Sequence, residues 1–90
     1  MVQILSIHMA GGEQHEHISE LEWRNTDTGV VYRDSRDSMV AFVRQNPGQA
    51  FVNHGGRVSY LGVVNGLHGL YVRTHADGFW NDNLLALPRY

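Results

Sequence analysis

Short segments with apolar side chains at alternate positions, separated by glycine-containing turns, constrain this chain most. Alternation at period two is typical of strands that turn one face toward a core. Most connections are too short for crossovers, so the pattern predicts mainly antiparallel pairing. The predicted strands cover residues 2–9, 15–24, 30–33, 50–53, 57–65 and 70–75.

The first two segments differ in how regularly they alternate. At period two, residues 2–9 place Leu5, Ile7 and Met9 on one face and Ile4, Ser6 and His8 on the other. In residues 15–24, Ile18 falls out of phase with the apolar positions that follow it. A β-bulge near Ser19 and Glu20 would return Ile18 to the core side and turn the preceding histidines away from it.

The period changes once, between the third and fourth predicted strands. An apolar stripe at three- and four-residue spacing begins at Met39, and Asp34 or Ser35 can cap the helix that it indicates. Asn46-Pro47-Gly48 ends this segment. The sequence therefore predicts one helix over about residues 35–46.

This order of elements, β-β-β-α-β-β-β, predicts an α+β fold. We expect a twisted antiparallel sheet of five or six strands with one helix packed on it. Residues 1–90 are expected to form a single domain, since a chain of this length supports one modest core. Exposed edge strands in so small a sheet favour pairing, so a homodimer is a further expectation.

Composition excludes several classes of function. There is no cysteine, which removes disulfides, cysteine-based zinc sites and thiol catalysis. The net charge is −2 and the seven cationic residues, all arginine, form no run, so nucleic-acid binding is not expected. No apolar run reaches the roughly 18 residues of a membrane span and no signal segment is recognisable. We therefore expect a cytoplasmic protein without a membrane partner.

His15-x-His17 is the strongest metal signal. Residues two apart on a strand project to the same side, so both imidazoles can reach one ion. Zinc or another divalent metal would also need ligands from further histidines or carboxylates. The alternative is that an imidazole forms a hydrogen bond and structures the loop after Gly12, in which case no cofactor is expected.

Arg73, His75 and Asp77 are candidates for a polar strip near the end of the chain. Alternate residues of a strand share a face, and an arginine, a histidine and a carboxylate together can form an anion site or an acid/base pair. The alternative is a solvated strand face, with Asp77-Gly78 present because that dipeptide makes a tight turn.

The residues that follow allow two interpretations. Asp82 and Asn83 offer oxygen ligands for a hard cation, but their spacing fits no calcium loop. As the simpler account, Asn81 or Asp82 caps a short helical turn whose leucines close the core, and Asn83 bonds to the backbone. Trp80 either contacts a ligand or partner or belongs to the core, as large aromatics in small domains usually do.

Three local patterns resemble a small family of bacterial and phage proteins known only as a domain of unknown function. They are Gly12-x-x-His15-Glu16-His17-Ile18, then Ser35-Arg36 with Met39-Val40, and Arg73-Thr74-x-Ala76-Asp77-Gly78-x-Trp80-x-Asp82-Asn83-Leu84-Leu85-x-Leu87-Pro88. The resemblance covers nearly the whole chain. It implies a stand-alone domain of bacterial or phage origin, and it carries no activity, substrate or cofactor.

We expect a non-catalytic protein-interaction module, with no catalytic residues. The residues expected to contact a partner or ligand are Arg73, His75, Asp77, Trp80, Asp82 and Asn83. One alternative is a small-ligand or anion-binding protein that uses the same arginine and histidine. A second is a metal-dependent enzyme centred on His15 and His17.

Overall fold

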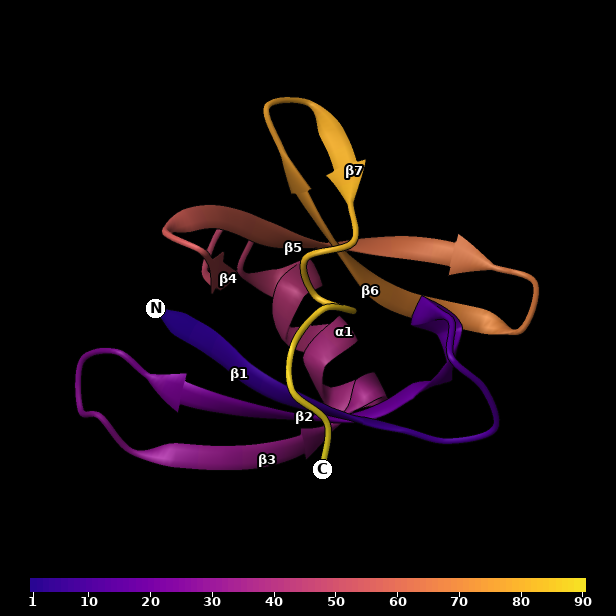
Figure 1. Ribbon diagram of the computed structural model, residues 1–90, viewed down its shortest axis with the longest axis horizontal. Coiled ribbons are helices and arrows are strands. Elements are labelled where there is room, and N and C mark those ends of the chain that lie inside the picture. The colour runs from indigo at the N-terminus through magenta and orange to yellow at the C-terminus, as the bar shows by residue number, and fades with distance from the viewer.

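A mixed sheet of seven strands and one α-helix make up the fold in the computed structural model, which describes residues 1–90 (Figure 1). The elements are β1 (Val2–Met9), the 3-10 turn η1 (His15–His17), β2 (Ile18–Asn25), β3 (Val31–Ser35), α1 (Arg36–Gln45), β4 (Ala50–His54), β5 (Arg57–Gly66), β6 (Gly69–Ala76) and β7 (Phe79–Asn81). The predicted α+β class and single helix are confirmed. The sheet has one strand more than expected, because residues 79–81 pair with β6.

The strands lie in the order β3-β2-β1-β4-β5-β6-β7. Every neighbouring pair is antiparallel except β1 and β4, which are parallel and paired through only two residues of each strand. The prediction of an antiparallel sheet is therefore corrected at this point. The chain between β1 and β4 contains β2, β3 and α1, which is long enough for the crossover that a parallel pair requires.

Two bulges set which side chains face the core. In β1, Ile4 pairs with Trp23 and Ser6 with Glu22, so the residue between them is unpaired. Ile4 and Ile7 are consequently both buried. The prediction that Leu5, Ile7 and Met9 share one face is wrong, because a bulge reverses the alternation.

The second bulge lies in β2 and confirms the sequence prediction. Met9 pairs with Ile18 and His8 with Glu20, which leaves Ser19 unpaired. Ile18 is therefore fully buried. The predicted strand over 15–24 nevertheless begins only at Ile18, since the three residues before it form η1.

The helix α1 begins where the sequence predicts. The Ser35 hydroxyl accepts a hydrogen bond from the Ser38 amide at 3.2 Å and thus caps the first turn. Met39, Val40 and Val43 are its buried residues and pack on β5 and β6. With ten residues, α1 is far from the length at which a helix could cross a membrane.

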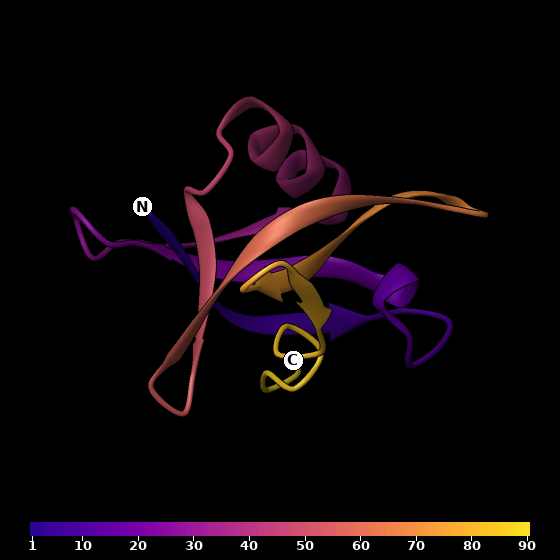
Figure 2. The same ribbon diagram turned by 90° about the horizontal axis from the view of Figure 1, so that it is seen from above.

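The tail after β7 closes the core opposite α1, so the sheet lies between the two in Figure 2. The Ile7 amide donates to the Pro88 carbonyl at 2.9 Å, and the Tyr90 amide donates to the Ile7 carbonyl at 3.0 Å. The tail thus follows the β1 edge beyond its short pairing with β4. Leu84 is fully buried, and Leu85 and Leu87 pack partly buried against the core, which agrees with the predicted closing role of these leucines.

The thirteen buried hydrophobic residues form one cluster. They are Val2, Ile4, Ile7, Ile18, Leu21, Met39, Val40, Val43, Ala50, Val52, Leu61, Val72 and Leu84. The cluster takes residues from both halves of the sheet, β1–β3 and β4–β7, and from α1 and the tail. Since β1 and β4 pair only briefly, these side chains hold the two halves together more than the backbone does.

Tyr90 anchors the end of the tail. Its hydroxyl donates to the Glu20 carboxylate at 3.1 Å, and the Arg33 guanidinium lies 4.2 Å from the centre of its ring. Burial, and then the hydrogen bond to Glu20, raise the pKa of Tyr90 to about 12. The tail is therefore fixed to β2 and β3 as well as to β1.

Candidate functional site

One surface of β5, β6 and β7 carries most of the candidate side chains, and we call it the outer face. Alternate β6 residues Tyr71, Arg73 and His75 point to this side, whereas Val72 and Thr74 between them are buried in the core. Trp80 joins the outer face because it pairs directly with His75 across β6 and β7. The prediction that Arg73 and His75 share a strand face is consistent with this register.

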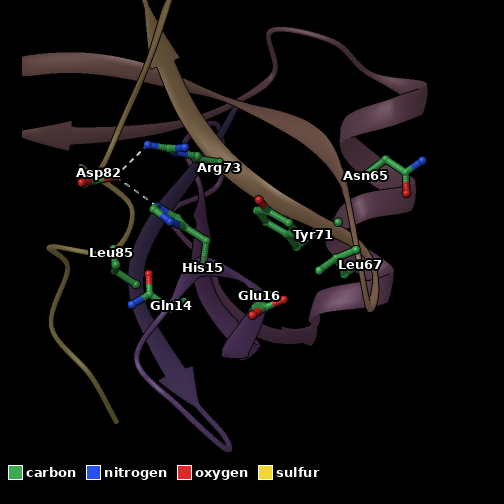
Figure 3. Close-up of a pocket in the computed structure, with 10 residues that line it drawn as sticks. Gln14, His15, Glu16, Asn65, Leu67, Tyr71, Arg73, Asp82 and Leu85 are labelled. Carbon is green, nitrogen blue, oxygen red and sulfur yellow. Dashed lines mark hydrogen bonds and ion pairs between the residues drawn. The ribbon is translucent and has the colours of Figure 1, made fainter.

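A cleft of about 750 Å³ lies where the outer face meets η1 and the tail, and we call it the His15 cleft. Its walls come from the η1 region, the β5–β6 hairpin and the tail (Figure 3). The η1 region contributes His15 and Glu16, β6 contributes Tyr71 and Arg73, and the tail contributes Asp82. The cleft is mostly polar.

Asp82 lies between Arg73 and His15 at the back of the cleft. The Arg73 Nη2 atom donates to Asp82 Oδ1 at 3.0 Å, and the Arg73 Nε atom donates to the Asn81 carbonyl at 3.3 Å. The His15 Nε2 atom lies 3.7 Å from the same Asp82 oxygen. The structure therefore brings together the His15 loop and the C-terminal motif, which the sequence alone does not place relative to each other.

His15 is held in an unusual state. Only 11% of its side chain is exposed, and its buried Nε2 atom has no hydrogen-bond partner, because 3.7 Å is too long for a hydrogen bond. Burial, and then the charge of Arg73, lower the pKa of His15 below its usual 6.5, while Asp82 acts in the opposite direction. The imidazole is thus neutral at neutral pH. Its buried Nε2 atom lacks a hydrogen-bond partner, which is rare inside proteins.

His17 does not join His15. The two histidines occupy a 3-10 turn, in which residues two apart point in different directions, so the prediction that both project to one side is wrong. The Gln14 amide donates to His17 Nδ1 at 3.2 Å. Gly12 lies against the ring, and a Cβ there would be 2.6 Å from it. His17 therefore structures the loop after Gly12.

A metal centre lacks the necessary grouping. No set of three or more His, Cys, Asp or Glu side chains is arranged to hold a metal ion. Asp82 is the carboxylate within 4 Å of the His15 ring, and its Oδ1 atom already accepts from Arg73. A zinc site needs at least three protein ligands, so the geometry offers no support for a metal-dependent enzyme centred on this pair.

His75 and Trp80 form an aromatic pair further along the outer face. Their ring centres are 5.5 Å apart and the planes make an angle of 82°, the edge-to-face arrangement that aromatic rings favour. Gly62 lies beneath the pair, and a Cβ there would be 3.0 Å from Trp80 and 3.1 Å from His75. Trp80 is nevertheless 48% exposed, so it does not belong to the core.

Asp77 lies in the β6–β7 turn and outside the predicted strip. Its φ is +54° and that of Gly78 is +83°, so both central residues of this two-residue hairpin are left-handed. Asp and Gly are the residues that such a turn requires. The turn explains Asp77 fully, and the polar strip ends at His75.

Asn83 belongs to a polar cluster around the buried Ser59 and Thr74 on the core side, which we call the Asn81 network. The Asn81 and Asn83 amides both donate to the Ser59 hydroxyl at 3.0 Å. The Thr74 hydroxyl donates to the Asn81 side-chain oxygen at 2.6 Å and accepts from the Leu84 amide at 3.1 Å. The network fixes the start of the tail to β5 and β6.

Of the two expected caps, Asn81 or Asp82, the contacts of the network favour Asn81. The Asn81 side-chain oxygen accepts from the Asn83 amide at 3.0 Å, whereas Asp82 is engaged with Arg73. Asn83 bonds to a side chain rather than to the backbone. Sequence reasoning missed Ser59 and Thr74, although both are polar residues at alternate, core-facing strand positions, beside Leu61 and Val72.

Comparison with known proteins gives one match. A family model described as "Protein of unknown function (DUF3892)" matches residues 3–88, which confirms the resemblance to a domain of unknown function. Neither the curated proteins nor the solved structures provided a match. Any functional reading therefore depends on the site itself.

Proposed function

We propose that this protein is a non-catalytic module that binds a protein partner through the outer face. The chain belongs to the DUF3892 family of proteins of unknown function. Trp80 carries the proposal: its ring is positioned by His75 and Gly62 while 48% of it faces solvent. An aromatic side chain fixed before binding loses little entropy on contact, which is why tryptophan and tyrosine dominate binding energy in interfaces.

The surroundings of Trp80 extend this surface. By strand alternation Val58 and Tyr60 lie on the same face, and they are 42% and 38% exposed. Tyr60 pairs directly with His75, so the three rings are neighbours across β5, β6 and β7. Grouped exposed apolar side chains on a small domain are typical of interaction sites. The nearby Arg73 and Asp82 supply a polar rim.

A non-catalytic role is consistent with the composition of the His15 cleft. Its walls include no serine, threonine or cysteine that could act as a nucleophile. Arg73 and Asp82 are already paired with each other. The His15 cleft is therefore better suited to binding than to covalent chemistry.

The test is affinity capture from an extract of the source cells, with Trp80→Ala against the unaltered protein. We expect the specific partner to be lost while the circular dichroism spectrum is unchanged. Phe79→Ala is the matched control, since Phe79 is an adjacent, 75% exposed aromatic that alternation turns to the other side. Undiminished capture by Trp80→Ala would refute the proposal.

Gly62→Ala tests the same surface without removing a binding residue. The added methyl group would come within 3.0 Å of the outer edge of the Trp80 ring, which would have to shift by a few tenths of an ångström. We expect weakened capture and a shifted tryptophan fluorescence maximum. Capture at full strength with a displaced ring would show that the position of Trp80 is irrelevant.

Three further expectations from the sequence stay predictions: the homodimer, the cytoplasmic location and the bacterial or phage origin. The homodimer has one structural support. β3 is an edge strand whose residues Val31 and Tyr32, with the adjacent Val30, are 46–49% exposed. Sedimentation analysis at several concentrations tests it directly.

A further inference from the structure

The sheet has two outer edges, β3 and β7, and they differ in how well they are protected (Figure 1). β7 is only three residues long, so it offers little backbone to another strand. β3 has five residues, contains no proline and pairs with β2 in an unbroken register. Short strands, prolines and bulges are the devices by which proteins prevent pairing at an edge. The β3 edge lacks all three.

The backbone of β3 presents unpaired groups at Val31 and Arg33. The Asn25 amide donates to the Val30 carbonyl at 2.9 Å, so these two residues form a hydrogen-bonded pair at the start of the β2–β3 ladder. Such pairs alternate along an antiparallel ladder, which turns the N–H and C=O groups of Val31 and Arg33 away from β2. No other backbone or side-chain group bonds to them. They are free to pair with a further strand.

The exposed side chains of β3 are apolar or aromatic. Val30, Val31 and Tyr32 are 46%, 49% and 46% exposed, and they are consecutive. The Tyr32 ring stacks on Trp23, with ring centres 4.7 Å apart. One face of this edge therefore continues an aromatic row that starts on β2 and ends without a neighbour.

The charged residues of β3 do not guard the edge, because both have partners on β2. The Arg33 Nε atom donates to the Glu22 carboxylate at 3.1 Å. The Asp34 carboxylate accepts from the Trp23 Nε1 atom at 2.7 Å. An edge charge opposes pairing when a new strand would leave it without a partner. Here the two charges keep their partners when another strand is added.

A second copy of the chain fits this edge in one register. Antiparallel pairing about a two-fold axis can be centred on Val31, Tyr32 or Arg33, since the unpaired groups must face each other. Centring on Val31 would need Gly29, whose φ of +78° and bonded amide exclude it from a strand. Centring on Arg33 would place two arginines directly opposite each other, which is unfavourable.

Centring on Tyr32 avoids both problems. Val31 of each copy then lies opposite Arg33 of the other, and both of these pairs exchange backbone hydrogen bonds. The two Tyr32 side chains become direct neighbours. They join the Trp23–Tyr32 stacks of the two copies into one aromatic row, and cross-strand aromatic pairs stabilise sheets.

We propose that β3 pairs antiparallel with β3 of a second copy, centred on Tyr32, so that two sheets join into one. The proposal rests on the homodimer expected from the sequence and names its interface. It is independent of partner binding through Trp80, because β3 and β7 are opposite edges of the sheet.

The test is disulfide cross-linking, which the chain suits because it contains no cysteine. We expect Tyr32→Cys to give a covalent dimer on mild oxidation, since the Cα atoms of such a pair lie about 4.5 Å apart, within the reach of a disulfide. Val31→Cys and Arg33→Cys are the matched controls. In this register their like residues are about 8 Å apart, too far for a disulfide.

The cross-linking pattern has outcomes that would overturn the proposal. Faster linking through Val31→Cys or Arg33→Cys would contradict the register. Leu67→Cys measures random collision, because Leu67 is 98% exposed and lies in the β5–β6 turn. Linking of Tyr32→Cys no faster than that of Leu67→Cys would refute the interface.

Charge variants test the register without a covalent bond. Val31→Lys places a cation opposite Arg33 of the second copy, twice in each dimer, and we expect the dimer dissociation constant to rise about tenfold. Val31→Glu places a carboxylate there instead and should leave the constant unchanged or lower it. Val58→Lys, at another exposed valine, is the control and should have no effect. Equal weakening by Val31→Lys and Val31→Glu would refute the predicted pairing with Arg33.

Sedimentation separates failure of the interface from failure of the homodimer. A dimer in which Tyr32→Cys does not cross-link would refute the β3 interface and leave the homodimer standing. A monomer at every concentration would refute both. Protection of the Val31 and Arg33 amides from hydrogen exchange only after a different protein binds would also overturn the proposal, because a strand of that protein would then occupy the edge.

Discussion

Asp82 and Asn83 are neighbours in the chain but belong to two different polar clusters. Asp82 faces the His15 cleft, where it pairs with Arg73 and leaves His15 Nε2 without a partner. Asn83 faces the core side, where it donates to the Ser59 hydroxyl. One cluster leaves a buried nitrogen without a partner, whereas the other centres on two buried hydroxyl groups, those of Ser59 and Thr74, which both have partners.

The difference separates a structural role from a binding role. In the Asn81 network, the polar atoms of Ser59 and Thr74 are buried and all have partners, which is the condition under which buried polar groups stabilise a fold. In the cleft, a buried histidine nitrogen lacks one. Asp82 beside it is 72% exposed, so a ligand in the cleft can reach its carboxylate.

The largest expected effect comes from the Asn81 network. Thr74→Val keeps the side-chain shape but leaves the buried Leu84 amide without an acceptor and removes one of the two hydrogen bonds that the Asn81 side-chain oxygen accepts. We expect the free energy of unfolding to fall by about 2–3 kcal/mol, the cost of orphaned buried groups. Urea unfolding measures it, and a loss below about 0.5 kcal/mol would show that the network does not stabilise the tail.

The pH dependence of the free energy of unfolding tests the burial of His15 in the cleft. The pKa of His15 is lower in the folded state than its usual 6.5, so protonation favours the unfolded chain. The contribution of neutral His15 is complete above about pH 6.5 and is lost as the pH falls toward the lowered folded pKa. We expect His15→Gln to flatten this part of the stability curve. An unchanged slope would contradict the burial of a neutral imidazole.

The smallest effects are shifts of the His15 pKa itself. Arg73→Gln removes a positive neighbour and should raise the pKa of His15, whereas Asp82→Asn removes a negative neighbour and should lower it further. NMR titration of the imidazole ring protons of His15 measures both. Shifts of the same sign in the two variants would contradict the arrangement of the three groups.

Much of the fold follows from sequence patterns, with errors at identifiable residues. Ile18 predicted the bulge at Ser19 because its phase conflicted with the apolar positions after it. Leu5 did not indicate the bulge in β1, because an apolar residue fits either face of a strand. That bulge was therefore not predicted. The parallel pairing of β1 with β4 depends on where α1 returns the chain, which periodicity does not encode.

The candidate site was predictable in its parts and not in its arrangement. Arg73 and Asp82 were both expected among the binding residues, and His15 was expected as a metal ligand. Their contact depends on how the tail folds back over β6 beside η1, a long-range feature without a local signal. Local structure, by contrast, explains the presence of His17 and Asp77. His17 contacts Gly12 in its own loop, and Asp77 occupies a left-handed turn position.

The most direct test compares Asp82→Ala with Asn83→Ala in parallel urea unfolding experiments. If the two clusters differ as described, Asn83→Ala lowers the free energy of unfolding by about 1–2 kcal/mol, because it removes a partly buried hydrogen bond to the buried Ser59 hydroxyl. Asp82→Ala changes it by less than about 0.5 kcal/mol, since it removes an exposed ion pair. Equal losses in the two variants, or a larger loss for Asp82→Ala, would contradict the division into a structural network and a binding cleft.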